Sequence, residues 1–254
     1  MVGRRMCEDA AREERSDAGV VVSPGSVIVR WGVPALLGAA AIVAVRPSRA
    51  WAAGDPVWRT YTYRETTRDM TTEAVYRWAW WGSSQSLRVS EGDNDFECEA
   101  DASGGTLREH YRNTARGDVV KIVREGADLV FKGRVRDETV DIRRAVGDVP
   151  WKASFFFLRA FALGDAREKE FYIAIPSGKL ASRMRATKQP RERLTLPIGS
   201  VDAVPVLLTA PGIPAFVWSS RCWYRTSDGL LVRFVGRRGP PGTPPTTSEL
   251  IREE

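Results

Sequence analysis

The side chains that could do acid–base or nucleophilic chemistry are few and lie far apart. The chain has one histidine, His110, which shares a predicted strand face with Arg108 and Arg112. A general base could act from that position, but an isolated histidine on an exposed strand is usually structural. No serine lies in the G-x-S-x-G context of a nucleophile elbow, so a serine hydrolase would have to recruit His110.

Three acidic residues, Glu97, Glu99 and Asp101, alternate along one predicted strand and therefore share a face. Paired carboxylates catalyse glycoside hydrolysis, but a solvated outer face explains this pattern better. One histidine and separated cysteines give no metal cluster at a recognised ligand spacing. We therefore predict no catalytic residue, no cofactor and no metal site, and expect that the protein is not an enzyme.

Charge patterning argues against nucleic-acid binding. The formal net charge is +6, and most basic residues are arginines interleaved with acidic residues, as between Arg134 and Arg143. Nucleic-acid binding usually needs clustered basic residues beside aromatic stacking platforms. The interleaved pattern indicates a solvated face of strands, and we expect no nucleic-acid partner.

An uncharged apolar run covers residues 33–45 and is followed by Ala50-Trp51-Ala52-Ala53. Such a run after a basic residue, closing on an A-x-A site, is typical of a secretory signal peptide. At ~1.5 Å per residue it is too short for a ~30 Å hydrocarbon core, so a retained membrane anchor is the weaker alternative. We predict an N-terminal extension and signal peptide over residues 1–52, cleaved between Ala52 and Ala53, and an extracytoplasmic, periplasmic domain over residues 53–254.

Removal of this leader would leave two of the three cysteines, Cys98 and Cys222. In an oxidising compartment they could form a disulfide, which would stabilise the fold by up to about 4–5 kcal/mol in the chain-entropy model. Both lie in strand-like segments, so two unpaired buried thiols are an equally good interpretation.

Period-two alternation dominates residues 53–254, with Tyr76, Trp78 and Trp80 on one face of a predicted strand. This pattern marks half-buried strands, and short turns rich in Gly, Asn and Asp separate them. Sequential hairpins follow, so we predict a mainly β, antiparallel meander in one domain. The Pro/Gly-rich tail over residues 237–247 should be extended or loop-like, with at most an edge segment after it.

One segment lacks alternation, residues 151–163, from Trp151 to Leu163. Asp148 and Pro150 precede it and Gly164 follows it, which are plausible helix start and stop signals. We predict one helix here that packs against a face of the sheet.

Large aromatic side chains are numerous for a single sheet. They could simply form a core beneath a curved sheet, or they could line an apolar cleft between sheet and helix. For the second interpretation, the predicted ligand-binding residues are Trp78, Trp80, Phe156, Phe157 and Trp223.

The order of features from Gly147 onward is distinctive. An aromatic helix precedes Pro176-Ser177-Gly178-Lys179, and Cys222-Trp223-Tyr224 and the proline-rich tail come last. This order resembles an exported bacterial β-domain family of unknown function. The resemblance implies an envelope location and a strongly curved, half-barrel-like antiparallel sheet with a helix against it, a shape similar to periplasmic carriers of lipoproteins or lipids. It implies no catalytic residues.

These observations favour an exported, non-catalytic cell-envelope protein that binds an apolar ligand or envelope partner on the concave face of its sheet. The expected partner is an apolar small molecule, a lipid or an envelope protein, with no permanent membrane span after cleavage. One alternative is a structural envelope module with a filled core. Another is a hydrolase that uses His110 or a surface pair of acids.

Overall fold

The computed structural model describes residues 57–81, 83–238 and 242–254. The predicted signal peptide over residues 1–52 and its cleavage site at Ala52 and Ala53 lie outside these residues. Within the described ranges, no helix combines the length and the apolar character that a membrane span requires.

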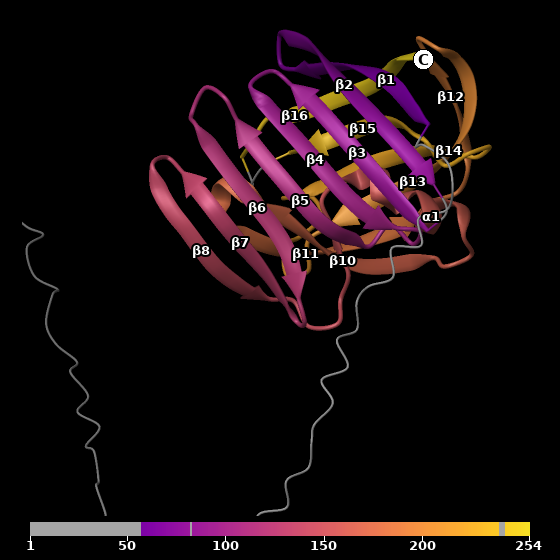
Figure 1. The fold of residues 1–254 in the computed structure, drawn as a ribbon. Coiled ribbons are helices and arrows are strands. Elements are labelled where there is room, and N and C mark those ends of the chain that lie inside the picture. The colour runs from indigo at the N-terminus through magenta and orange to yellow at the C-terminus, as the bar shows by residue number, and fades with distance from the viewer. Residues whose placement is uncertain (1–56, 82, 239–241) are drawn as a thin grey trace, which may run out of the picture. The chain divides into compact units, whose positions relative to one another are not determined.

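The first half of the chain is a continuous antiparallel meander, as its alternation predicts. Each strand pairs with the next through a short turn, and Figure 1 shows the eight strands side by side. They are β1 (Trp58–Thr67), β2 (Met70–Trp81), β3 (Ser84–Glu91), β4 (Asn94–Asp101), β5 (Thr106–Asn113), β6 (Asp118–Glu125), β7 (Asp128–Val135) and β8 (Glu138–Ala145).

The second half extends the same sheet. Its strands are β9 (Trp151–Lys152), β10 (Glu168–Ile175), β11 (Leu180–Lys188), β12 (Glu192–Leu196), β13 (Gly199–Thr209), β14 (Ser219–Arg225), β15 (Leu231–Arg237) and β16 (Pro245–Glu253). The strand order is β8-β7-β6-β5-β4-β3-β2-β1-β16-β15-β14-β13-β11-β10-β9, with β12 paired only to β13. All neighbours are antiparallel except β9 and β10. The predicted mainly β, antiparallel class is therefore confirmed.

The C-terminal strand corrects one expectation. The tail was expected to be extended or loop-like and to add at most an edge segment, but β16 begins at Pro245 and pairs with β15 on one side and β1 on the other. Its alternate residues Thr246, Ser248 and Leu250 are buried, so it is an interior strand. Pro245 is tolerated because it is the first residue of the strand.

The predicted helix is shorter than expected. Trp151 and Lys152 form β9, paired in parallel with β10, and only a 3₁₀ turn, η1 (Phe155–Leu158), and a five-residue helix, α1 (Arg159–Leu163), follow. The Ser154 side chain accepts a hydrogen bond from the Phe156 N–H and so caps η1. Burial of Trp151 and Lys152 against the sheet outweighs the helical preference of this segment.

The sheet curls into an open half-barrel, as the resemblance implies. Side chains of β5–β8 share one core with Trp151 of β9 and Ala174 of β10, so inner faces from opposite ends of the sheet meet. The β10–β11 connection, η2 (Pro176–Gly178) followed by Lys179, reaches across to β8. The Lys179 Nζ atom lies 2.6 Å from Glu138 Oε2, and Arg144 Nε donates to the Lys179 carbonyl at 3.1 Å.

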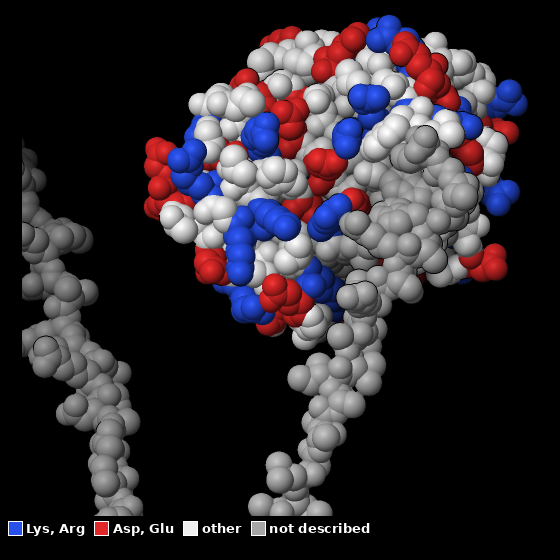
Figure 2. Space-filling view, viewed as in Figure 1, with Lys and Arg blue, Asp and Glu red and all other residues white. Residues whose placement is uncertain are grey.

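Charges of both signs are interspersed over the face shown in Figure 2, without a patch of one sign. Glu97 forms an ion pair with Arg88 at 3.0 Å, and Glu99 forms one with Arg108. These contacts agree with the interpretation of Glu97 and Glu99 as parts of a solvated outer face.

The β4–β5 turn holds the η1 segment against the sheet. The buried Lys152 ammonium donates to the carbonyls of Ser103, at 3.3 Å, and Gly104. Gly104 has a φ of +74°, and a Cβ atom there would lie 2.0 Å from the Phe157 carbonyl oxygen. Only glycine allows this close approach of turn and η1.

We expect Gly104→Ala to destabilise the protein by at least about 2 kcal/mol, because backbone strain and a clash with backbone act together. Gly126→Ala is the matched control, since Gly126 also has a positive φ but would place its Cβ in open space. That control should cost only about 1 kcal/mol. Urea denaturation measures both values, and equal losses would contradict the proposed contact.

Candidate functional site

A cavity of about 920 Å³ lies on the concave side of the half-barrel. Its walls come from β1–β5, β15 and β16, from the turns after β5 and β7, from η1, from the β10–β11 hairpin and from the β13–β14 connection. Most lining side chains are apolar or aromatic, among them Tyr63, Tyr76, Leu87, Phe156, Met184 and Phe234. Ligand pockets typically have volumes of about 300–1,000 Å³ and apolar walls, so this cavity is large enough for a small ligand.

Aromatic rings form a packed wall on the η1 side. Phe156 stacks on Tyr76 with 5.0 Å between ring centroids, and Tyr63 meets Tyr76 edge-on at 4.9 Å. The Tyr63 hydroxyl donates to the Leu231 carbonyl on β15. These contacts span three parts of the chain and fix the rings in offset and edge geometries that aromatic pairs favour.

Charged residues line the cavity beside the hairpin turns of β3–β4, β5–β6 and β7–β8. Arg238 is paired with Glu65 and, at 2.8 Å, with Glu91, while Arg116 is paired with Asp118 at 2.9 Å. Burial raises the pKa of Glu91 to about 7, although the Arg238 guanidinium lowers it. The charged residues at this rim of the cavity are therefore largely paired with one another.

Glu109 is a buried carboxyl among the apolar walls. It lines the cavity from β5 with 2% of its surface exposed. Its Oε2 atom has no hydrogen-bond partner among the residues that the structure describes. Burial raises the pKa of Glu109 to about 8, so its neutral, hydrogen-bond-donating form predominates at neutral pH. Opposite it on β4 lies Cys98, whose pKa burial raises well above its ordinary value.

Of the five predicted ligand-binding residues, the structure brings only Phe156 to the cavity. Phe157 is buried but does not line it. Trp78 and Trp80 lie beyond the cavity near α1, where the Arg159 guanidinium sits 5.1 Å and 4.6 Å from their ring centroids. Trp80 is half exposed.

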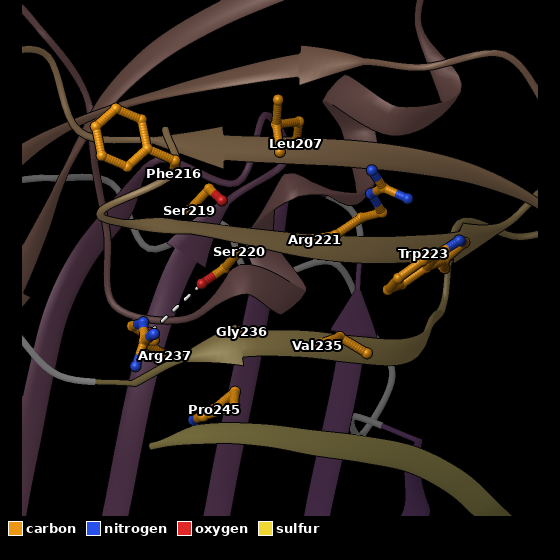
Figure 3. A pocket seen from close by; sticks show the side chains of 10 residues that line it. All are labelled: Leu207, Phe216, Ser219, Ser220, Arg221, Trp223, Val235, Gly236, Arg237 and Pro245. Atoms are coloured by element: carbon orange, nitrogen blue, oxygen red, sulfur yellow. Dashed lines mark hydrogen bonds between the residues drawn. The ribbon is translucent and has the colours of Figure 1, made fainter. Parts of the chain in front are cut away.

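Trp223 lies elsewhere, beside a second, shallower depression of about 360 Å³ on β13–β16 (Figure 3). Alternation along β14 places it with Ser219 and the exposed Arg221, opposite to Cys222. Its indole N–H donates to Glu192 of β12. Trp223 therefore packs on the outer side of the sheet, away from the large cavity.

The other candidates for chemistry are dispersed. His110 is exposed on β5, between the cross-strand neighbours Glu97 and Lys121, and does not line the cavity. Cys98 and Cys222 are buried free thiols, which corresponds to the second of the two alternatives left open by the sequence. The described residues contain no cluster of three or more His, Cys, Asp or Glu that could hold a metal ion.

Sequence reasoning missed Glu109, although a signal was present. Alternation that places His110 and Arg108 outward on β5 must point Glu109 and Tyr111 inward. An acidic residue on the inner face of a strand is unusual and marks a site for inspection.

No family model matches this sequence, and no curated protein matches it. Its fold is similar to that of a β-barrel-like protein of the domain of unknown function DUF1849 from Brucella abortus, with a TM-score of 0.51 and 12% identity, covering 78% of this chain and 97% of that one. A LolA superfamily protein from Nitrosomonas europaea aligns with a TM-score of 0.24 and 12% identity over 79% of this chain and 86% of its own. The fold match with the DUF1849 protein agrees with the predicted resemblance to half-barrel domains of unknown function.

We expect Glu109→Gln to stabilise the protein in a pH-dependent way. The folded state keeps the Glu109 proton up to a pKa of about 8, whereas the unfolded chain loses it near ~4.3. The folded state thus holds the extra proton between these values, and stability falls as pH rises through this range. The substitution removes that loss, which amounts to on the order of 3 kcal/mol at pH 7 and about 1 kcal/mol at pH 5.

Chemical denaturation of the variant and the wild-type protein at pH 5 and pH 7 measures this difference. Glu97→Gln, at an exposed position paired with Arg88, is the control and should change stability little at either pH. If the stability gained by Glu109→Gln is the same at pH 5 and pH 7, ionisation of the buried Glu109 carboxyl costs little stability, which would contradict the prediction.

Proposed function

We propose that this protein binds an apolar ligand, such as a fatty-acyl chain, inside the concave cavity. The observation that carries the proposal is the cavity itself, about 920 Å³ in volume and walled mainly by apolar and aromatic side chains. A purely structural module would be expected to fill this space with side chains, because protein interiors are close-packed. The cavity thus supports the binding role over the purely structural alternative.

We further propose that the role is non-catalytic. Nucleophilic catalysis needs a nucleophile and a base within hydrogen-bond reach of each other. Among the described residues that line the cavity, Cys98 has a thiol whose pKa is raised by burial, which disfavours the reactive thiolate. His110 lies outside the cavity, so a hydrolase that uses this histidine gains no support.

The proposed place of action is the cell envelope, after export. This rests on the apolar run over residues 33–45 and the small residues at Ala52 and Ala53, which are typical of a cleaved secretory signal. Amino-terminal sequencing of the protein recovered from its native cell would check it, and an uncut chain in the cytoplasm would contradict it.

Binding can be measured with cis-parinaric acid, a fatty acid that fluoresces in apolar surroundings. We expect saturable binding to the wild-type protein and at least a tenfold weaker affinity for Ser182→Trp. Ser182 is half-buried on β11 and lines the cavity, so an indole there would occupy part of the volume.

Ser200→Trp is the matched control, because it places the same side chain at an exposed strand position on β13. It should bind the probe within about twofold of the wild-type protein. Thermal unfolding confirms that both variants are folded. Equal loss of affinity in the two variants, or no saturable binding to the wild-type protein, would contradict the proposed site.

A further inference from the structure

The buried carboxyl of Glu109 lacks a hydrogen-bond partner for its Oε2 atom among the residues that the structure describes. In the sheet, Glu109 pairs with Cys98 on β4 and Ile122 on β6, and neither offers a strong hydrogen-bond partner. A buried polar atom that lacks a partner costs about 1–3 kcal/mol, and most such atoms in native proteins are satisfied. The unsatisfied Oε2 atom therefore points to a group that the cavity receives from outside.

Among the residues that the structure describes, no charged group neutralises Glu109. The charged residues that line the same cavity are Glu91, Arg116, Arg136, Arg237 and Arg238. None of them contributes to the raised pKa of Glu109, which burial alone explains. Arg116 and Arg238 are already paired with Asp118, Glu65 and Glu91, so they are not counterions for Glu109.

Glu109 also lies away from the charged rim. It precedes Asn113, the last residue of β5, by four positions, which is about 13 Å along a strand. Cys98 is its cross-strand neighbour on β4 and Leu87 is the next residue across on β3, and both line the cavity. Among these apolar walls, Glu109 therefore offers a buried carboxyl that has an O–H group to donate in its neutral form.

We propose that Glu109 is the recognition group of the cavity and donates a hydrogen bond to the carbonyl oxygen of an acyl ligand, either a fatty acid or a fatty-acyl ester. The inference rests on the proposed binding function and names its ligand class. The carbonyl oxygen of an ester, or of a fatty acid bound in its protonated form, satisfies the O–H group without bringing charge into the apolar cavity, where desolvation of an ion would cost several kcal/mol. A cationic amine is the less favourable occupant, because Arg116, Arg136, Arg237 and Arg238 line the same space.

Displacement of cis-parinaric acid at pH 6.5 by four twelve-carbon compounds tests this ligand class. The compounds are methyl laurate, lauric acid, dodecane and dodecylamine, assayed with the wild-type protein, Glu109→Gln and Glu109→Leu. In the wild-type protein, methyl laurate or lauric acid should displace the probe at about tenfold lower concentration than dodecane. The tighter binder of the two identifies ester or free acid as the source of the carbonyl.

Glu109→Gln should keep this preference, because its amide N–H₂ also donates, whereas Glu109→Leu should bind the ester no better than dodecane. Thermal unfolding shows whether each variant is folded, and Glu109→Gln alone still tests the idea if Glu109→Leu does not fold. A preference for dodecylamine that Glu109→Gln abolishes would overturn the proposal in favour of a cationic ligand.

Two further outcomes separate this proposal from the binding function itself. Equal preference for methyl laurate in the wild-type protein and Glu109→Leu would overturn the role of Glu109 and leave acyl binding intact. Absence of probe binding to the wild-type protein would overturn both.

Discussion

The pairing of β16 with both β15 and β1 is the interaction on which the half-barrel depends. Without it, the meander of β1–β8 and the C-terminal strands would be two separate sheets with exposed edges, which proteins avoid. The join is reinforced across the same seam, because Arg225 of β14 reaches Glu253 of β16 and Arg238 reaches Glu65 of β1. One sheet that is continuous through β16 can then curl until its two ends share a core.

The cavity exists because the curled sheet encloses more space than the short helical segment inside it can fill. A sheet of sixteen strands encloses more space than η1 and the five-residue α1 can occupy. On one side of the cavity, Phe156 of η1 packs against Tyr63 and Tyr76. The β10–β11 hairpin forms another wall. The space left between them is mainly apolar. Lost packing and the unsatisfied Glu109 carboxyl lower the stability of the fold, and proteins accept such losses at functional sites.

Local pattern predicted the strands well, because period-two alternation and glycine-rich turns act over neighbouring residues. It failed where a partner far along the chain decides the outcome. Pairing with β1 makes an interior strand of the tail after Pro245, and pairing with β10 removes Trp151 from the predicted helix. Of the residues predicted to bind a ligand, only Phe156 lines the cavity, because aromatic content does not tell which side of a strand faces inward. Trp223, for example, faces the outer depression.

Methyl resonances of ¹³C-labelled methionine offer the most direct test of a ligand-accessible cavity. Met184 is 2% exposed and lines the cavity, whereas Met70 is 70% exposed at the start of β2. On titration with methyl laurate, the Met184 methyl signal should shift and reach saturation while the Met70 signal stays in place. A Met184 signal that does not move, or that moves only in parallel with Met70 and without saturation, would contradict the account.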